Sequence, residues 1–291
     1  MTPPLPAGPF AVRWLGSEIP PQRAGARTGV TAQVENAGSV AWKGEPGRGV
    51  QISYHWLDLL GNPIVWAGIF TPLLEPVEPG ARTTLLFPVD APMPPGRYRL
   101  AIDLIDEPRA WFAELGNELN EVAIDVSPRI ARRALAVRIG EGPQELADVT
   151  RAALATQEEP VGPENAAEAV AFLAPGSKPA PDWSRRVLDA HSEGFAVVAG
   201  SVDVAGRRFR RGPARELEPW KPGFGRSPGW SLPLVNPSVL AEALASVRFV
   251  EPVLGLPAVE PSELREPWLC DGRIRVEIAA TALRRDVRRS A

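Results

Sequence analysis

The sequence predicts a multidomain protein, with an all-β sandwich over residues 1–127 and an α/β domain over residues 128–291. A chain of 291 residues has the length of about two ordinary domains. Apolar and polar residues alternate through the first part, which indicates strands, whereas helical spacing appears only after the Ser-Pro pair at 127 and 128. The 33 prolines mostly stand between apolar segments, as is typical of short strands joined by turns.

The strands of the first part are marked by a period of two. In VQISYHW the apolar residues at 50, 52, 54 and 56 fall on one face of a strand. The same alternation, or a short apolar run, marks further strands over 10–15, 30–34, 64–70, 82–89, 98–104, 109–113 and 122–126. About seven or eight short strands separated by Pro and Gly turns favour a β-sandwich.

Motifs within these strands also carry a resemblance to a known family. An Asn-x-Gly-x-x-x-Trp run stands at 36–42, a Tyr-His-Trp triplet at 54–56 and a Pro-Gly-x-Tyr-x-Leu strand at 95–100. Over residues 10–126 the chain resembles the immunoglobulin-like β-sandwich accessory domain found beside bacterial glycosyltransferases and other surface-polysaccharide proteins. None of these motifs is a catalytic signature, so the resemblance implies an accessory role for the domain.

The aromatic residues of the first part have two interpretations. We expect Trp42, Trp56 and Trp111 to pack in the core or along its edges, because large aromatic side chains bury much apolar area. His55 lies on the polar face of its strand, and Trp66 stands beside a Gly-rich turn. These two residues are therefore candidates for a small indole and imidazole platform that binds a sugar ring.

The second part begins with a strand, a turn and a helix. ALAVRIG is typical of a strand, and Pro143 starts a segment with helical spacing. The turn matches a dinucleotide-binding fingerprint only in Gly140 and Gly142, since Glu145 takes the place of the third glycine. An α/β pattern continues with a strand at 171–173, a helix that starts at 181–183 and a strand at 195–204.

The segment from Ala134 to Val204 is similar to a family 2 glycosyltransferase of the GT-A fold. The matching parts are the strand at 135–139, Asn165, the strand at 172–173, the Pro-x-Pro-Asp-Trp run at 179–183 and the strand at 196–200. That fold ends its central strand with Asp-x-Asp, whose carboxylates hold a divalent cation on the sugar nucleotide. Here the corresponding residues are Ala174, Pro175 and Gly176, whose side chains bind no metal.

The resemblance therefore implies a truncated and degenerate transferase-like domain. Only about 30 residues separate its first strand from Asn165, too few for the strands that carry the contact to the nucleotide base. The family's general base is often part of a Glu-Asp pair, and neither Glu251 nor Glu260 has the neighbouring Asp. We predict no catalytic residue and no metal site.

Two residues of the second part are candidates for binding a sugar or a phosphate. Lys178 has the charge to contact phosphate directly in place of a metal, although a solvated lysine in a Pro-rich loop is the simpler interpretation. Asn165 belongs to the transferase-like segment. Asp182 is expected at the start of a helix, where a carboxylate favours the helix dipole, and His191 is expected to be exposed near the end of that helix.

Composition narrows the partners and the compartment. A formal net charge of -3 and a pI near 5.7 give no reason to expect nucleic acid. The single Cys270 excludes an internal disulfide and, with two histidines, disfavours a Cys/His zinc site. Because no apolar run has the length of a membrane helix and the N-terminus lacks a secretory signal, we expect a cytoplasmic protein without a membrane span or a cofactor. The Arg-rich segment 207–215 and the basic tail are either solvated or bind acidic groups.

These observations support one leading function and two alternatives. The leading interpretation is a non-catalytic accessory or carbohydrate-binding protein of bacterial surface-polysaccharide assembly, whose partners are a glycan or nucleotide-sugar and an active glycosyltransferase. The first alternative is a metal-independent glycosyltransferase that uses a nucleotide-sugar donor. The second is a structural dimerisation module, which predicts a large apolar surface. The identity of the sugar and the oligomeric state stay open.

Overall fold

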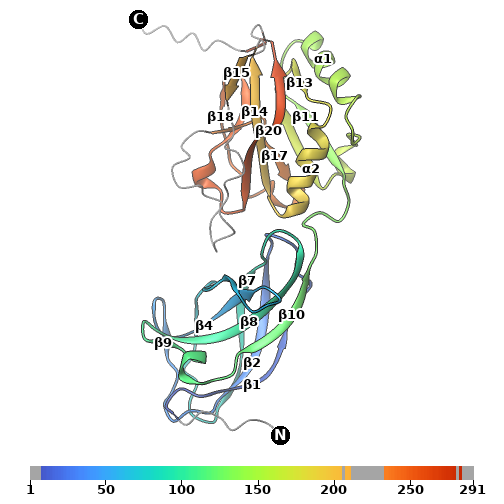
Figure 1. Ribbon diagram of the computed structural model, residues 1–291. Helices are drawn as coiled ribbons and strands as arrows, with labels where there is room; N and C mark the ends of the chain where they lie inside the picture. Colours follow the sequence, from blue (N-terminus) through green and yellow to red (C-terminus); the bar gives the residue numbers. More distant parts are fainter. Residues whose placement is uncertain (1–7, 205–206, 211–232, 280–281, 284–291) are drawn as a thin grey trace, which may run out of the picture. The chain divides into compact units, whose positions relative to one another are not determined.

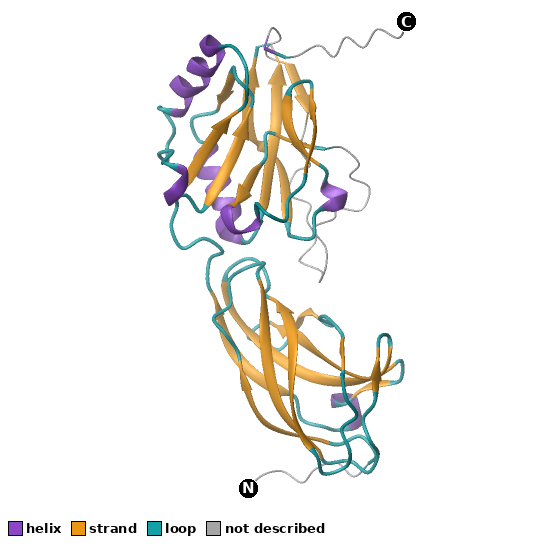
Figure 2. Ribbon diagram, turned by 180° about the vertical axis from the view of Figure 1, so that it is seen from behind, coloured by secondary structure: helices purple, strands orange, loops and turns teal. Residues whose placement is uncertain are grey.

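The chain forms two compact units (Figure 1). The computed structural model describes residues 8–204, 207–210, 233–279 and 282–283. Unit 1 holds the described residues up to Ser127, and unit 2 holds those from Pro128 onward. Strands make up most of unit 1, whose single helical segment among the described residues is the short 3-10 turn η1 (Ala113–Leu115) (Figure 2).

Unit 1 is a sandwich of two antiparallel sheets. The first sheet has the order β1-β2-β7, with β1 (Val12–Glu18), β2 (Arg27–Asn36) and β7 (Arg82–Asp90). The second has the order β10-β8-β4-β3, with β10 (Asn120–Val126), β8 (Gly96–Glu107), β4 (Arg48–Leu57) and β3 (Gly44–Glu45). Three short strands extend it, namely β5 (Pro63–Val65) and β6 (Thr71–Pro72) beside β4, and β9 (Ala110–Trp111) beside β8. The predicted β-sandwich is therefore present.

The core of unit 1 fills the space between its two sheets. Trp42 and Trp56 are fully buried, as predicted. Trp42 meets the ring of Phe112 edge-on at 5.5 Å, and the Trp56 indole donates a 2.8 Å hydrogen bond to the carbonyl of Asp90. Each indole therefore buries its apolar area, and Trp56 also satisfies its N–H group.

The central strand β4 is buried on both faces, which the sequence did not predict. The alternation places Ser53 and His55 on a polar face, yet both are as inaccessible as the apolar residues between them. The rings of Trp66 and Trp111 pack against His55, and these residues come from chain segments that follow β4 and β8. The polar face of β4 is therefore buried at His55, because later segments cover it.

Unit 2 is built on a mixed sheet with the order β11-β12-β17-β14-β20-β13, and β15 pairs with β14. Its strands are β11 (Leu135–Ile139), β12 (Ala169–Leu173), β13 (Ser177–Pro179), β14 (Val197–Val204), β15 (Arg207–Arg210), β17 (Ser238–Leu240) and β20 (Trp268–Ile278). The β11-β12 and β14-β20 pairs are parallel, whereas β17 runs antiparallel to both of its neighbours. A smaller antiparallel sheet has the order β16-β19-β18, with β16 (Leu234–Val235), β18 (Phe249–Val253) and β19 (Leu256–Val259).

Two α-helices belong to the described part of unit 2. They are α1 (Gln144–Leu154) and α2 (Trp183–Glu193), and short 3-10 turns form at Glu164–Ala166, Ala241–Ala243 and Pro261–Glu263. One side of α2, which includes Trp183, Val187 and Leu188, is buried. Helices and a sheet are thus both present, while the resemblance to the GT-A fold stays a prediction. None of the helices formed by the described residues is long and apolar enough to cross a lipid bilayer.

Two predictions about single residues of unit 2 are wrong. Lys178 lies in the edge strand β13, opposite Glu277 of β20, and not in a loop. His191 is completely buried because its side of α2 faces the sheet, where its imidazole contacts the Ser238 hydroxyl of β17. Asp182 precedes α2 as predicted, and its carboxylate accepts a 2.5 Å hydrogen bond from Arg186. Of the Arg-rich segment only 207–210 is described, as β15, and the basic tail from 284 onward lies outside the described residues.

Candidate functional site

A cavity of about 300 Å³ opens on unit 1 beside the outer face of β4, β8 and β10. We call it the Trp66 pocket. Its lining comes from these strands and from the turns that follow them, and consists of His55, Leu57, Gly61, Pro63, Trp66, Arg99, Asp103, Trp111, Ala113, Glu114, Leu119 and Glu121. The pocket therefore joins an aromatic wall to a set of charged side chains.

The register of three strands brings the charged residues to one place. His55 of β4 and Glu121 of β10 both lie opposite Ala101 of β8, one on each side of it. Residues opposite each other in neighbouring strands share a face, and so do residues two apart along a strand. Arg99 and Asp103 flank Ala101 at this spacing, so all four polar side chains emerge on the same face.

The aromatic wall consists of three neighbouring rings. The Trp66 side chain is 56% exposed, whereas His55 and Trp111 are buried beside it. The ring centroid of His55 lies 4.7 Å from that of Trp66 and 4.4 Å from that of Trp111, and the two indoles are 6.4 Å apart. Trp66 therefore offers an open indole face on a packed base.

Local backbone contacts hold Trp66 in this position. The imidazole Nδ1 of His55 donates a hydrogen bond to the carbonyl of Trp66. Two residues later, the backbone N–H of Gly68 donates a 2.8 Å hydrogen bond to the carbonyl of Tyr54. A Cβ atom at Gly68 would lie 2.5 Å from the Tyr54 ring, so only glycine lets the segment pass this close.

A buried carboxyl group forms the floor of the pocket. Asp103 Oδ2 lies 3.9 Å from His55 Nε2, and the Asp103 carboxylate accepts hydrogen bonds of 2.8 Å from the N–H of Leu104 and 3.3 Å from that of Ala113. Burial raises the pKa of Asp103, while the nearby His55 imidazole and the hydrogen bonds from these two N–H groups act in the opposite direction. The carboxyl group is thus fixed in place by three partners.

The outer charges of the pocket are also paired. Arg99 of β8 forms an ion pair with Glu121 of β10, and both side chains are partly accessible. The Glu114 carboxylate accepts a 3.1 Å hydrogen bond from the backbone N–H of Trp111. Each carboxyl group of the lining therefore has a partner, and the set supplies hydrogen-bond acceptors around an exposed aromatic face. Such a combination suits a ligand with an apolar face and a hydroxyl-bearing edge.

The structure brings together two of the four predicted binding residues. His55 and Trp66 share the pocket, whereas Asn165 and Lys178 are exposed residues of unit 2. Trp111 was expected only to pack, and Arg99, Asp103, Glu114, Leu119 and Glu121 were not predicted as binding residues. The alternation in β8 and β10 does place Arg99, Asp103 and Glu121 on polar faces, but the pairing of these strands with β4 was not predicted.

The position expected to have lost a metal site in unit 2 is closely packed. The N–H of Gly176 donates hydrogen bonds to the Leu146 carbonyl and the Thr150 hydroxyl, both in α1. A Cβ atom at Gly176, where φ is +86°, would lie 2.9 Å from the Ala282 side chain. The described residues contain no group of three or more His, Cys, Asp or Glu side chains that could hold a metal ion.

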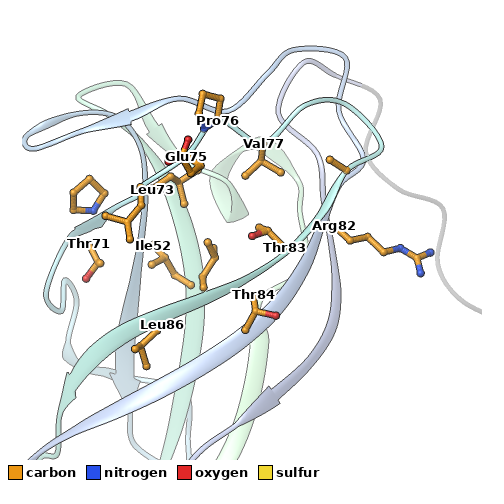
Figure 3. Close-up of a pocket in the computed structure, with 14 residues that line it drawn as sticks. Ile52, Thr71, Leu73, Glu75, Pro76, Val77, Arg82, Thr83, Thr84 and Leu86 are labelled. Atoms are coloured by element: carbon orange, nitrogen blue, oxygen red, sulfur yellow. The ribbon is translucent and has the colours of Figure 1, made fainter.

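A second hollow of about 490 Å³ lies in unit 1 between β7 and the segment 71–77 (Figure 3). In this view Ile52, Leu73 and Leu86 line the hollow while the Arg82 side chain points away. The lining is mostly aliphatic, with three threonines, Glu75 and Arg82, and includes no aromatic ring. Of these two hollows, the Trp66 pocket is the one with an exposed aromatic ring beside its polar side chains.

Comparisons with known proteins give only distant likenesses. No protein-family model and no curated protein matches the chain. Among solved structures, the C-terminal domain of wzt matches with 10% identity over 41% of this chain and 75% of that chain, at a TM-score of 0.29. A Paenibacillus sp. cycloisomaltooligosaccharide glucanotransferase matches with 20% identity, 52% and 19% coverage and a TM-score of 0.26. A glycosyl hydrolase family 2 member from Bacteroides cellulosilyticus DSM 14838 matches with 12% identity, 47% and 21% coverage and a TM-score of 0.26.

These matches span three quarters of the first protein and about a fifth of the other two. TM-scores this low do not establish a common fold. The function therefore has to be argued from the geometry of the Trp66 pocket.

Proposed function

We propose that the protein is a non-catalytic accessory protein whose unit 1 binds carbohydrate and holds a sugar ring against Trp66. The observation that carries the proposal is an exposed indole, supported by the buried rings of His55 and Trp111 and bordered by hydrogen-bonding groups. One face of a pyranose ring is rich in C–H groups and packs on an aromatic face, while its hydroxyls donate to carboxylates. The pocket presents both kinds of partner.

The state of the carboxyl groups favours binding over catalysis. A glycosidase needs one carboxyl group free to donate a proton and another free to attack or to activate water. In the Trp66 pocket Asp103 is held by two backbone N–H groups, Glu114 by the N–H of Trp111 and Glu121 by Arg99. Groups fixed in this way suit the orientation of a ligand.

The biological setting rests on the resemblance of residues 10–126 to accessory domains of polysaccharide proteins. On that ground we place the protein beside bacterial surface-polysaccharide assembly, with a glycan as its ligand and a glycosyltransferase as its partner. The alternative of a metal-independent transferase is less well supported, because Lys178 belongs to an edge strand and the turn before it packs against α1.

The proposal is tested by calorimetric titration of the full chain with a panel of oligosaccharides. Trp66→Ala removes the exposed ring and is expected to weaken binding at least about fivefold, since an aromatic contact contributes about 1 kcal/mol or more. Leu74→Ala is the matched control, because Leu74 is 94% exposed and lines the second hollow.

Circular dichroism verifies that both variants keep the fold. Unchanged affinity in Trp66→Ala, or equal losses in both variants, would show that the Trp66 pocket is not the binding site. A loss in Leu74→Ala alone would move the site to the second hollow.

A further inference from the structure

Resting on the proposed function, we infer that the Trp66 pocket binds uncharged or amino-bearing sugars and discriminates against sugars that carry a carboxylate. The inference extends the proposal from carbohydrate in general to a chemical class of sugar. It depends on the charges that line the pocket and on how they are paired.

Negative groups outnumber positive ones in the lining. Three carboxyl side chains, those of Asp103, Glu114 and Glu121, face the pocket together with a single guanidinium, that of Arg99. Glu114 and Glu121 are both accessible to solvent. Two carboxyl groups stand against one guanidinium even when Asp103 is left out of the count, so negative charge is in surplus in the lining.

Arg99, the one cationic group of the lining, already has a partner. Arg99 is paired with Glu121 across β8 and β10. A carboxylate on a ligand would have to share or break this ion pair in order to reach the guanidinium. It would also be placed near Glu114 and Glu121, and like charges at a binding site reduce affinity for the wrong ligand.

His55 does not offer a compensating donor. Its Nδ1 proton is used by the carbonyl of Trp66, and its Nε2 faces the Asp103 carboxyl group. Both ring nitrogens therefore have partners within unit 1. An anionic sugar would find no unpaired cationic side chain in the lining, all of which lies within the described residues.

A neutral sugar makes favourable contacts with the same carboxyl groups. Its hydroxyls donate to carboxylate oxygens, which keep spare lone pairs after accepting one hydrogen bond. An ammonium group on an amino sugar gains further from the negative surplus and from the exposed face of Trp66, since a cation over an indole is attracted by the ring. The pocket thus binds amino and neutral sugars more tightly than their acidic counterparts.

The test uses the full chain and matched methyl glycosides. The probes are the methyl glycosides of glucose, galactose and mannose, the methyl glycosides of the three corresponding uronic acids, and methyl glucosaminide. Binding is followed by NMR through the indole N–H signal of Trp66, assigned by its loss in Trp66→Ala. We expect each uronide to bind at least about tenfold more weakly than its neutral parent at low ionic strength, with a smaller gap at high salt.

A charge-removing variant and a matched control make the test specific. Glu121→Gln removes one negative charge and releases Arg99, so uronide binding should approach that of the neutral parent. Asp125→Asn is the control, because Asp125 pairs with Arg97 across the same two strands and lies outside the pocket lining. It should leave the ratio of neutral to acidic affinity unchanged.

The outcomes separate this inference from the proposed function. If no probe of any charge shifts the Trp66 signal, the carbohydrate-binding proposal fails and the inference fails with it. If uronides bind as tightly as their neutral parents, or if Glu121→Gln and Asp125→Asn change the ratio equally, only the charge selection is overturned. The inference is supported if the difference in affinity between uronides and their neutral parents disappears in Glu121→Gln but not in Asp125→Asn.

Discussion

His191 should make unit 2 lose stability in mild acid. Its Nδ1 lies 2.7 Å from the Phe195 carbonyl, which must accept, so this nitrogen carries the proton. Its Nε2 lies 2.9 Å from the Ser238 hydroxyl and, in a neutral ring, accepts from it. The neutral imidazole is therefore fully satisfied, and burial, assisted by the positive charge of Arg129, lowers the pKa of His191 from 6.5 to about 4.

The size and the sign of the effect follow from that pKa. Above pH 6.5 the imidazole is neutral in both the folded and the unfolded chain, so the full stability is present. As the pH falls toward 4, His191 binds a proton in the unfolded chain but stays mostly neutral in the folded chain. Each pKa unit corresponds to about 1.4 kcal/mol, so His191 should remove about 3 kcal/mol from the free energy of unfolding of unit 2 by the time the pH reaches its folded-state pKa.

The assay compares the wild-type chain with His191→Gln, which keeps hydrogen-bonding groups but does not titrate. Urea unfolding is followed through amide NMR signals of unit 2 at about pH 7.5 and about pH 4.5. The difference in unfolding free energy between the two proteins should change by most of the 3 kcal/mol between these conditions, with wild type losing more. His55→Gln is the control, since the chain has only these two histidines and His55 belongs to unit 1.

Two results would refute this reasoning. The first is a His191 imidazole signal that titrates near pH 6.5 in the folded protein, because a protonated ring would then be tolerated at that site. The second is parallel loss of stability in wild type and His191→Gln, which would assign the acid sensitivity to other groups.

Two glycine substitutions test the close backbone contacts. Gly68→Ala should lower the unfolding free energy of unit 1 by about 1–3 kcal/mol and weaken sugar binding, because its Cβ would overlap the Tyr54 ring. Urea unfolding measures this loss, with Gly16→Ala as the control, because a Cβ at Gly16 would meet nothing within 4 Å. Equal losses of unfolding free energy in the two variants would contradict the prediction. Gly200→Ala should cost unit 2 about 3 kcal/mol or more, because its Cβ would lie 1.8 Å from a carbonyl oxygen of β20. Thermal melting measures this loss, with Gly162→Ala as the control, because a Cβ at Gly162 would meet nothing within 4 Å. A Gly200→Ala protein as stable as wild type would show that β14 and β20 separate easily.

The strands of unit 1 and two residues of its candidate site, His55 and Trp66, could be predicted because the information is local. Alternation with period two is visible within a single strand, and it located β2, β4, β8 and β10. His55 and Trp66 are only eleven positions apart, on a strand and on the turn that returns beside it. The sequence pattern was therefore enough to pair them.

The rest of the pocket depends on contacts between segments far apart in the chain. Trp111 reaches His55 from a segment beyond β8, and the pattern around Trp111 indicates only an apolar side chain. The same limit explains the error at His191. A helix end near a glycine usually lies at the surface, but here the hydroxyl that meets the imidazole comes from Ser238, 47 positions later. No local pattern shows which side of α2 a later strand will cover.

The register of the second sheet in unit 1 links the fold to its proposed function. Ala101 of β8 lies opposite His55 of β4 on one side and opposite Glu121 of β10 on the other, with Arg99 and Asp103 at the flanking positions of its own face. A slip of one residue between β8 and either neighbour would turn one set of these side chains to the opposite face. The small side chain of Ala101 also adds little bulk between the two polar neighbours. The affinity and the charge selection proposed for the pocket are thus properties of strand pairing, and they should be lost together whenever that pairing is disturbed.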